Sequence, residues 1–119
     1  MSNLMEKEKF IIYETVLKEE GSFIYDLHNN QNFQKEKINL LLTECRELLG
    51  IYKDNGKSNK YATILTGMTS TLQHTLFLIS CHFMPDDEFT IKNYERDLSS
   101  EIVSDYYIKF RVVLHDLIF

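Results

Sequence analysis

The segment from Tyr61 to Met84 constrains the fold most, because it contains no Asp, Glu, Lys or Arg. Its apolar residues recur at three- and four-residue intervals, which predicts a helix over about 60–84. The segment is long enough to span a bilayer, which takes about 20 apolar residues. Its many threonines, together with Gln73, His74 and His82, would then need hydrogen-bond partners inside lipid. We therefore expect a central, largely buried helix of a soluble bundle.

The rest of the chain contains few residues that interrupt helices, with one proline and four glycines in 119 residues. Apolar stripes predict further helices over about 3–20, 33–53, 90–98 and 100–118. Such a set of amphipathic helices buries its stripes by packing helix against helix. The sequence therefore predicts an all-α protein, an antiparallel bundle of four to five helices in a single domain over residues 1–119.

Local signals mark some helix ends. Gly21 is expected to end the first helix, and Ser99 or Ser100 to cap the last one. Residues 22–32 fit two interpretations, a short helix capped by Ser22 or a brief extended segment. Helix topology is left open by these local signals.

Two predicted stripes define the sides of helices that should be buried. In the first helix the stripe consists of Phe10, Ile12, Tyr13, Val16 and Leu17. In the helix over 60–84 it consists of Tyr61, Leu65, Met68, Leu72, Leu76, Ile79 and Phe83.

Cysteine usage and the N-terminus indicate the compartment. Cys45 and Cys81 both lie in apolar, helix-like segments, where a thiol behaves as a small hydrophobe. Two such cysteines do not make a disulfide framework, which suits a reducing compartment. Charged residues at positions 6–9 stand where a signal peptide needs an apolar core. We therefore expect a cytoplasmic protein.

The net charge of −5 is spread unevenly. Residues 1–50 carry nine acids and six bases, residues 51–85 one acid and three bases, and residues 86–119 eight acids and four bases. The most basic stretch is the turn-rich segment 53–60. An acidic surface lacks the Lys and Arg that displace counterions from phosphates, which argues against general nucleic-acid binding. It suits a protein partner with a basic surface.

The segment HTLFLISCH brings together three side chains that can bind metals. No pair among His74, Cys81 and His82 has the i, i+3 or i, i+4 spacing that lets two side chains of a helix bind one ion. A nucleophilic Cys81 would need a low-pKa environment, and the sequence shows none. The sequence therefore predicts a packed core here, with no metal and no cofactor.

Arg111 and His115 stand one turn apart on the predicted last helix. The pair is similar to the motif of helical-bundle ribonucleases of the HEPN class, an arginine followed by four to six residues and a histidine. Here three residues intervene and neither Asn nor Asp follows Arg111, so the chain departs from that pattern. The resemblance implies an alternative function as a small ribonuclease or nucleotide-acting enzyme. Arg111 would stabilise phosphate charge and His115 would move a proton.

With no other catalytic constellation in the sequence, a non-enzymatic binding protein is favoured. The most specific form of this hypothesis is a bacterial toxin-immunity or inhibitor protein that covers a basic active site by stoichiometric occlusion. Tyrosine beside carboxylates recurs at protein interfaces. The predicted partner-binding residues are Asp86, Asp87, Glu88, Glu101, Asp105 and Tyr106. A regulatory or adaptor domain that dimerises through the last helix remains an alternative, and the oligomeric state is not predicted.

Overall fold

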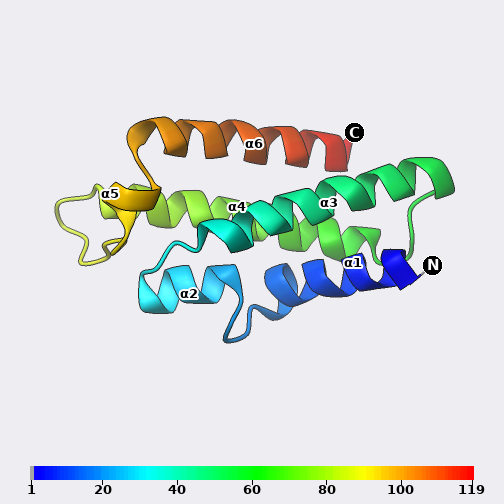
Figure 1. Cartoon of the computed structure of the whole chain (residues 1–119), viewed down its shortest axis with the longest axis horizontal. Helices are drawn as coiled ribbons and strands as arrows, with labels where there is room; N and C mark the ends of the chain where they lie inside the picture. The colour runs from blue at the N-terminus through cyan, green and yellow to red at the C-terminus, as the bar shows by residue number, and fades with distance from the viewer. Residues whose placement is uncertain (1) are drawn as a thin grey trace.

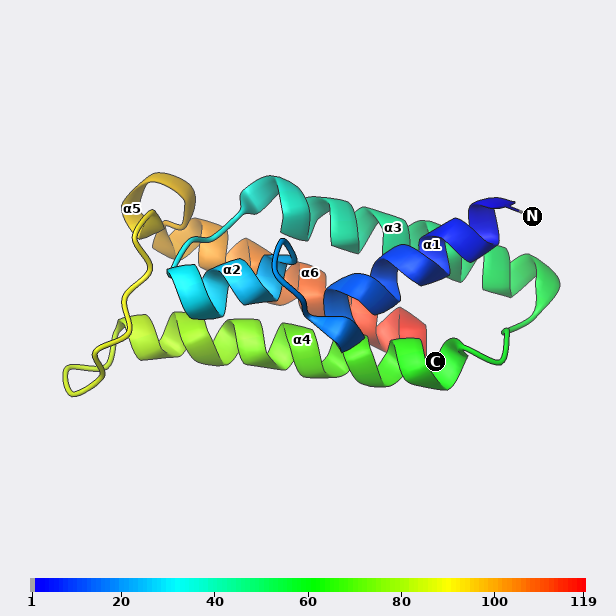
Figure 2. The same ribbon diagram turned by 90° about the horizontal axis from the view of Figure 1, so that it is seen from below.

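The computed structural model describes residues 2–119 and is a bundle of six α-helices with one π-helical turn, without strands over these residues (Figure 1). In chain order the elements are α1 (Ser2–Ile12), η1 (Tyr13–Leu17), α2 (Phe23–Asn30), α3 (Lys35–Asn55), α4 (Tyr61–His82), α5 (Tyr94–Asp97) and α6 (Ser100–Ile118). The long helices α3, α4 and α6 lie along the 47 Å axis, and α4 runs antiparallel to both α3 and α6, which run in the same direction (Figures 1 and 2). The predicted all-α helical bundle is confirmed, with six α-helices over residues 2–119 where four to five were predicted.

Helix α4 is the centre of the bundle, because it contacts α1, η1, α2 and α6. The predicted stripe on this helix is only partly right. Met68, Leu72 and Ile79 are buried as expected, whereas Phe83 is 60% exposed. Because other helices pack on more than one side of α4, they bury more of its circumference than a single stripe of residues covers. Buried residues outside the stripe are Ile64, Gly67, Thr71, Thr75, Leu78 and Cys81.

The buried threonines of α4 have hydrogen-bond partners on the backbone. Thr75 Oγ1 donates to the Thr71 carbonyl at 2.8 Å, and Thr71 Oγ1 donates to the Thr15 carbonyl of η1 at 3.3 Å. These bonds allow an uncharged but polar helix to occupy the core. None of the helices over residues 2–119 combines the length and hydropathy needed to cross a membrane.

The first helix changes its winding at Tyr13. The Lys18 N–H donates to the Tyr13 carbonyl at 3.1 Å, which closes a π-helical turn. The wider turn shifts the following side chains around the helix, so that Glu14 and Thr15 are buried. Two residues of the predicted stripe, Val16 and Leu17, are instead 42% and 55% exposed, so this part of the prediction is wrong.

The end of the first helix also differs from the prediction. The helix stops at Lys18, whose φ of 52° lies in the left-handed region, three residues before the expected Gly21. Gly21, with φ of 97°, lies in the following turn. Tyr13 holds that turn, because its hydroxyl donates to the Glu20 carbonyl at 2.8 Å.

Residues 23–30 form a helix, which decides between the two interpretations of this region. Ser22 caps α2 by accepting from the Tyr25 N–H at 3.3 Å. The buried Glu14 carboxylate accepts from the Phe23 N–H at 2.9 Å, at the helix end where a negative charge is favourable. Burial raises the pKa of Glu14, while the Phe23 N–H and the charge of Lys37 oppose that rise.

Polar contacts fasten α1 to α3. The Lys7 ammonium, only 8% exposed as a residue, lies 2.5 Å from Glu44 and 2.6 Å from Glu47. Hydrogen bonds to these two carboxylates raise the pKa of Lys7. On the same helix Glu8 accepts hydrogen bonds from the hydroxyls of Tyr52 and Ser58. Lys7 and Glu8 are therefore both buried, and their charged groups have hydrogen-bond partners.

The predicted helix over 90–98 is wrong in extent, because α5 is a single turn. The Lys92 N–H instead donates to the Gln31 carbonyl at 2.8 Å. The backbone before α5 therefore makes a tertiary hydrogen bond in place of a helical one. The other boundaries lie within about two residues of the predictions. Ser99 caps α6 as expected, since its hydroxyl accepts from the Ile102 N–H at 3.4 Å.

Candidate functional site

One end of the bundle carries exposed carboxylates from two segments. Asp86, Asp87 and Glu88 lie in the loop between α4 and α5, and Glu101 and Asp105 lie in the first two turns of α6. Both views place this loop, α5 and the start of α6 at the same end of the molecule (Figures 1 and 2). We call these five residues the acidic end. They are all exposed.

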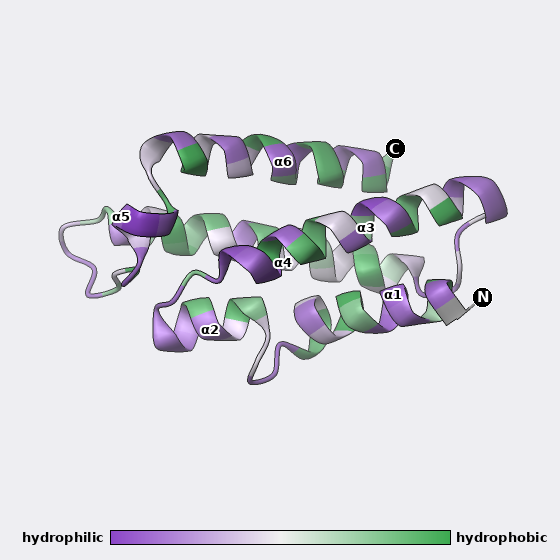
Figure 3. Cartoon of the chain, viewed as in Figure 1, coloured by the Kyte–Doolittle hydropathy of each residue, from purple (hydrophilic) through white to green (hydrophobic). Residues whose placement is uncertain are grey.

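The net charge of the chain is concentrated at this end. Residues 86–105 contain seven acids and two bases, which gives −5. The other residues then hold 18 − 7 = 11 acids and 13 − 2 = 11 bases, which cancel. Helix α5 is correspondingly hydrophilic, whereas the loop before it has both hydrophilic and hydrophobic segments (Figure 3). The molecule therefore presents a directional electrostatic field rather than a uniformly acidic surface.

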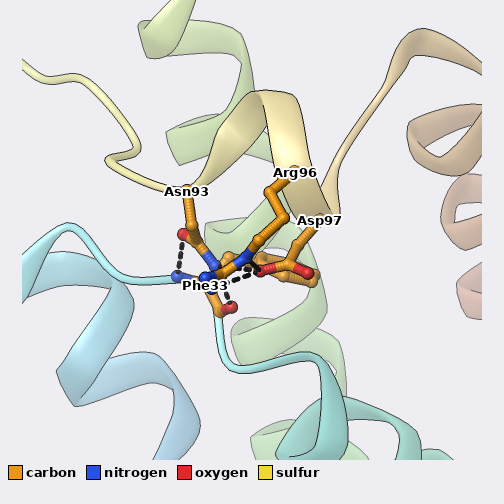
Figure 4. A network of polar contacts seen from close by, with 4 residues as sticks. All are labelled: Phe33, Asn93, Arg96 and Asp97. Carbon is orange, nitrogen blue, oxygen red and sulfur yellow. Dashed lines mark hydrogen bonds and ion pairs between the residues drawn. The ribbon is translucent and has the colours of Figure 1, made fainter.

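Asn93 anchors the acidic end to the connection between α2 and α3 (Figure 4). Its side chain accepts from the Phe33 N–H at 2.9 Å and donates to the Phe33 carbonyl at 2.7 Å. Its amide nitrogen also lies 2.7 Å from the Asp97 carboxylate, which pairs with Arg96 at 2.9 Å. Hydrogen bonds from Arg96 and Asn93 lower the pKa of Asp97. We call these contacts the Asn93 clasp.

Apolar side chains lie beside the carboxylates. Phe83 and Met84, which immediately precede the acidic loop, are 60% and 50% exposed. The Phe83 ring packs edge-on against His82 and Tyr94, each with ring centroids 5.1 Å apart. His82 stacks on Tyr94 at 4.4 Å and accepts from the Ile91 N–H at 2.9 Å. A supported aromatic ring flanked by charges is typical of the anchor of a protein interface.

Tyr106, one of the six predicted contact residues, is not at the surface. It is 2% exposed, and its hydroxyl donates to Asn39 Oδ1 at 2.8 Å. Its ring packs edge-on against Phe33 with centroids 5.5 Å apart. Burial raises the pKa of Tyr106. The neighbouring Tyr107 is 51% exposed, so of these two tyrosines it is Tyr107 that a partner could reach.

The cysteines lie in the core. Cys81 is 3% exposed, and burial together with the Asp87 carboxylate raises the pKa of its thiol. Burial raises the pKa of Cys45 to about 12. Neither environment favours a nucleophilic thiolate. Within residues 2–119, no group of three or more His, Cys, Asp or Glu side chains is arranged to hold a metal ion.

His74 does not simply fill the core, because it meets a histidine from another helix. His74 Nε2 lies 3.3 Å from His28 Nδ1 of α2. Lys18, at the end of η1, is bonded nearby to Ser70 at 3.1 Å. Burial is the main cause that lowers the pKa of His74, and the charges of His28 and Lys18 add to it. No sequence signal pointed to this pair, since its members are 46 residues apart.

The free energy of unfolding should therefore fall on acidification. The pKa of His74 lies below its ordinary value of 6.5 in the folded protein, so the stability is fully present above pH 6.5 and is lost as pH falls through the folded pKa. We expect denaturation midpoints measured between about pH 7 and pH 5 to fall less in His74→Gln than in the wild type. His115→Gln, at an exposed position of α6, is the control. Identical pH profiles for the His74 variant and the wild type would contradict this assignment.

Arg111 and His115 both lie exposed on α6. His115 Nδ1 is 3.5 Å from Asp116 Oδ1, and its ring lies 4.9 Å from that of Phe119. His115 also lines a groove against α3, whereas Arg111 is not among the residues that line it. Arg111 and His115 are therefore both accessible, but they do not line the same pocket.

The chain matches no protein-family model, and neither curated proteins nor solved structures show a significant similarity to it. Its function must therefore be argued from its own surface and side chains.

Proposed function

We propose that the protein is a non-enzymatic, cytoplasmic binding protein that neutralises a basic protein partner by stoichiometric occlusion. The most specific form of the proposal is an immunity or inhibitor protein directed against a bacterial toxin. The observation that supports it is the concentration of the whole net charge of −5 in residues 86–105. Many enzymes that attack nucleic acid present Lys and Arg to phosphates, and a compact set of carboxylates competes for the same side chains.

The acidic end also has features that favour tight binding once the partners meet. Phe83 and Met84 offer apolar surface that a partner can bury, next to carboxylates that speed the encounter. The Asn93 clasp holds the segment that follows Met84 against the bundle, which lowers the conformational entropy lost on binding. The carboxylates thus attract the partner, the two apolar side chains supply contact area, and the clasp keeps the surface ordered before binding.

A charge-reversal experiment tests the proposal with the partner that co-purifies from source cells in a native pull-down. The test variant changes four exposed carboxylates of the acidic end to lysine, at Asp86, Glu88, Glu101 and Asp105. We expect the association rate at low salt to fall at least about tenfold, and the effect to shrink as salt is added.

The matched control has the same net charge as the test variant. It carries four exposed carboxylates changed to lysine outside the acidic end, at Glu6, Glu19, Glu20 and Asp54. The control should retain most of the association rate. Equal losses in both variants, or unchanged binding in the test variant, would reject the acidic end as the contact surface.

A dimerising adaptor is a second candidate, supported by the outer side of α6. Ile108 and Val112, one turn apart, are 56% and 50% exposed. Sedimentation over a range of concentrations distinguishes this function, because the mass would rise to that of a dimer in the wild type and not in Ile108→Glu. A concentration-independent monomer mass would exclude it.

A further inference from the structure

A groove of about 610 Å³ lies between the second half of α3 and the last turns of α6. It stands at the end of the bundle opposite the acidic end (Figures 1 and 2). Its cationic lining residues are Arg46, Lys53 and Lys57, and we call it the basic groove. The volume is within the range of sites that hold small molecules.

The three cations form no salt bridge. Within residues 2–119 none of them takes part in an ion pair. The Lys57 ammonium lies over the ring of Tyr61, 4.2 Å from its centroid. Lys53 stands in the last turn of α3, where a positive charge complements the helix dipole. Arg46 lies more than two turns before that end, so the dipole does not account for it. One carboxylate, Asp116, also lines the groove, so three cations and one anion leave the lining with a net positive charge.

Gly50 lines this groove and lies in the interior of α3. A glycine there costs roughly 1 kcal/mol relative to alanine. The fold does not require it, because a Cβ at Gly50 would meet no atom within 4 Å. The contrast is Gly67, where a Cβ would lie 2.4 Å from Thr15 Oγ1. Open space for a ligand along the groove is a physical reason for a glycine at position 50.

Apolar surface completes the groove. Leu49 of α3 and Phe119 line it, and Phe119 is 88% exposed. The His115 ring lies beside that of Phe119, with centroids 4.9 Å apart. A planar ring can pack on such a surface, and an anionic group can reach the cations around it.

We propose that the basic groove binds a nucleotide. The base packs on Leu49 and Phe119, and the phosphate is held by Arg46, Lys53 and Lys57. Guanidinium and ammonium groups are the side chains that bind phosphate most strongly, the first by paired hydrogen bonds and the second as a point charge. This site is separate from the acidic end and does not depend on the partner proposed above.

Calorimetric titration of the wild-type protein tests the proposal with three probes, AMP, adenosine and inorganic phosphate. We expect saturable binding of AMP, and at least about tenfold weaker binding of adenosine and of phosphate, because each offers half of the contacts. An absence of saturable AMP binding up to millimolar concentration would overturn the proposal. Tighter binding of a single-stranded RNA oligomer than of AMP would overturn it as well.

Variants tie the binding to the groove. Gly50→Leu places a large side chain in the groove and should abolish AMP binding. The melting temperature of this variant should not fall, because leucine is the better helix former. Lys53→Gln and Lys57→Gln should each weaken AMP binding about three- to tenfold. The control is Lys60→Gln, an exposed lysine of the same loop that is not among the groove's lining residues. Full AMP binding by Gly50→Leu, or an equal loss in Lys60→Gln, would reject the groove as the site.

Discussion

Replacing Gly67 with alanine is expected to lower the free energy of unfolding by about 2 kcal/mol. The added Cβ would lie 2.4 Å from Thr15 Oγ1 and 2.9 Å from Val16 Cγ2. Thr15 cannot turn away easily, since it is 1% exposed and its hydroxyl donates to the Ile11 carbonyl at 2.8 Å. The π-helical turn η1 would have to move off α4. Alanine has the higher helix propensity, which offsets roughly 1 kcal/mol of the loss. The expected net loss of about 2 kcal/mol already includes this gain.

Chemical denaturation of Gly67→Ala and Gly50→Ala together provides the measurement and its control. Both glycines lie inside long helices, so the change in helix propensity is the same. Gly50→Ala meets no neighbouring atom and should stabilise the protein by up to about 1 kcal/mol. If Gly67→Ala also stabilised the protein, the close approach of η1 to α4 would be refuted.

Replacing Asn93 with alanine is expected to lower the free energy of unfolding by about 2–3 kcal/mol. The substitution removes both hydrogen bonds to the Phe33 backbone and the bond to Asp97. Phe33 is 1% exposed, so its N–H and carbonyl groups would lose their partners in a largely buried place. An unpaired buried polar group costs more than a hydrogen bond contributes when it forms.

Amide hydrogen exchange rates show which segment Asn93→Ala destabilises. We expect faster exchange in residues 83–98, because the clasp is the main side-chain link of this segment to the α2–α3 connection. Asn29→Ala is the matched control. Asn29 is exposed and donates to the Tyr25 carbonyl of its own helix, so its loss should cost less than about 0.5 kcal/mol. Equal stability of both variants would show that the clasp does not anchor the segment.

The partner-binding prediction from sequence depended on charge and on side-chain accessibility. Charge is a property of composition, and the five predicted carboxylates do lie exposed at one end. Accessibility depended on the rotation of α6. Tyr106 shares the inward side of α6 with Phe110, Val113 and Leu117, which places a predicted contact residue in the core.

Local interactions explain what the sequence by itself determined. The helical periodicity of α3, α4 and α6, and the caps at Ser22 and Ser99, depend on residues within about four positions of one another. These signals are present before the chain packs, so the all-α class and most boundaries could be predicted.

Tertiary packing decided the rest, because the deciding contacts join distant positions. The clasp between Phe33 and Asn93 spans 60 residues, and the His28–His74 pair spans 46. The burial of Glu14 and Thr15 depends on the contact of the π-helical turn with α4, and Gly50 lines a groove only when α6 lies beside α3. No periodicity encodes such contacts, since their free energy appears only when helices that are remote in sequence share one core.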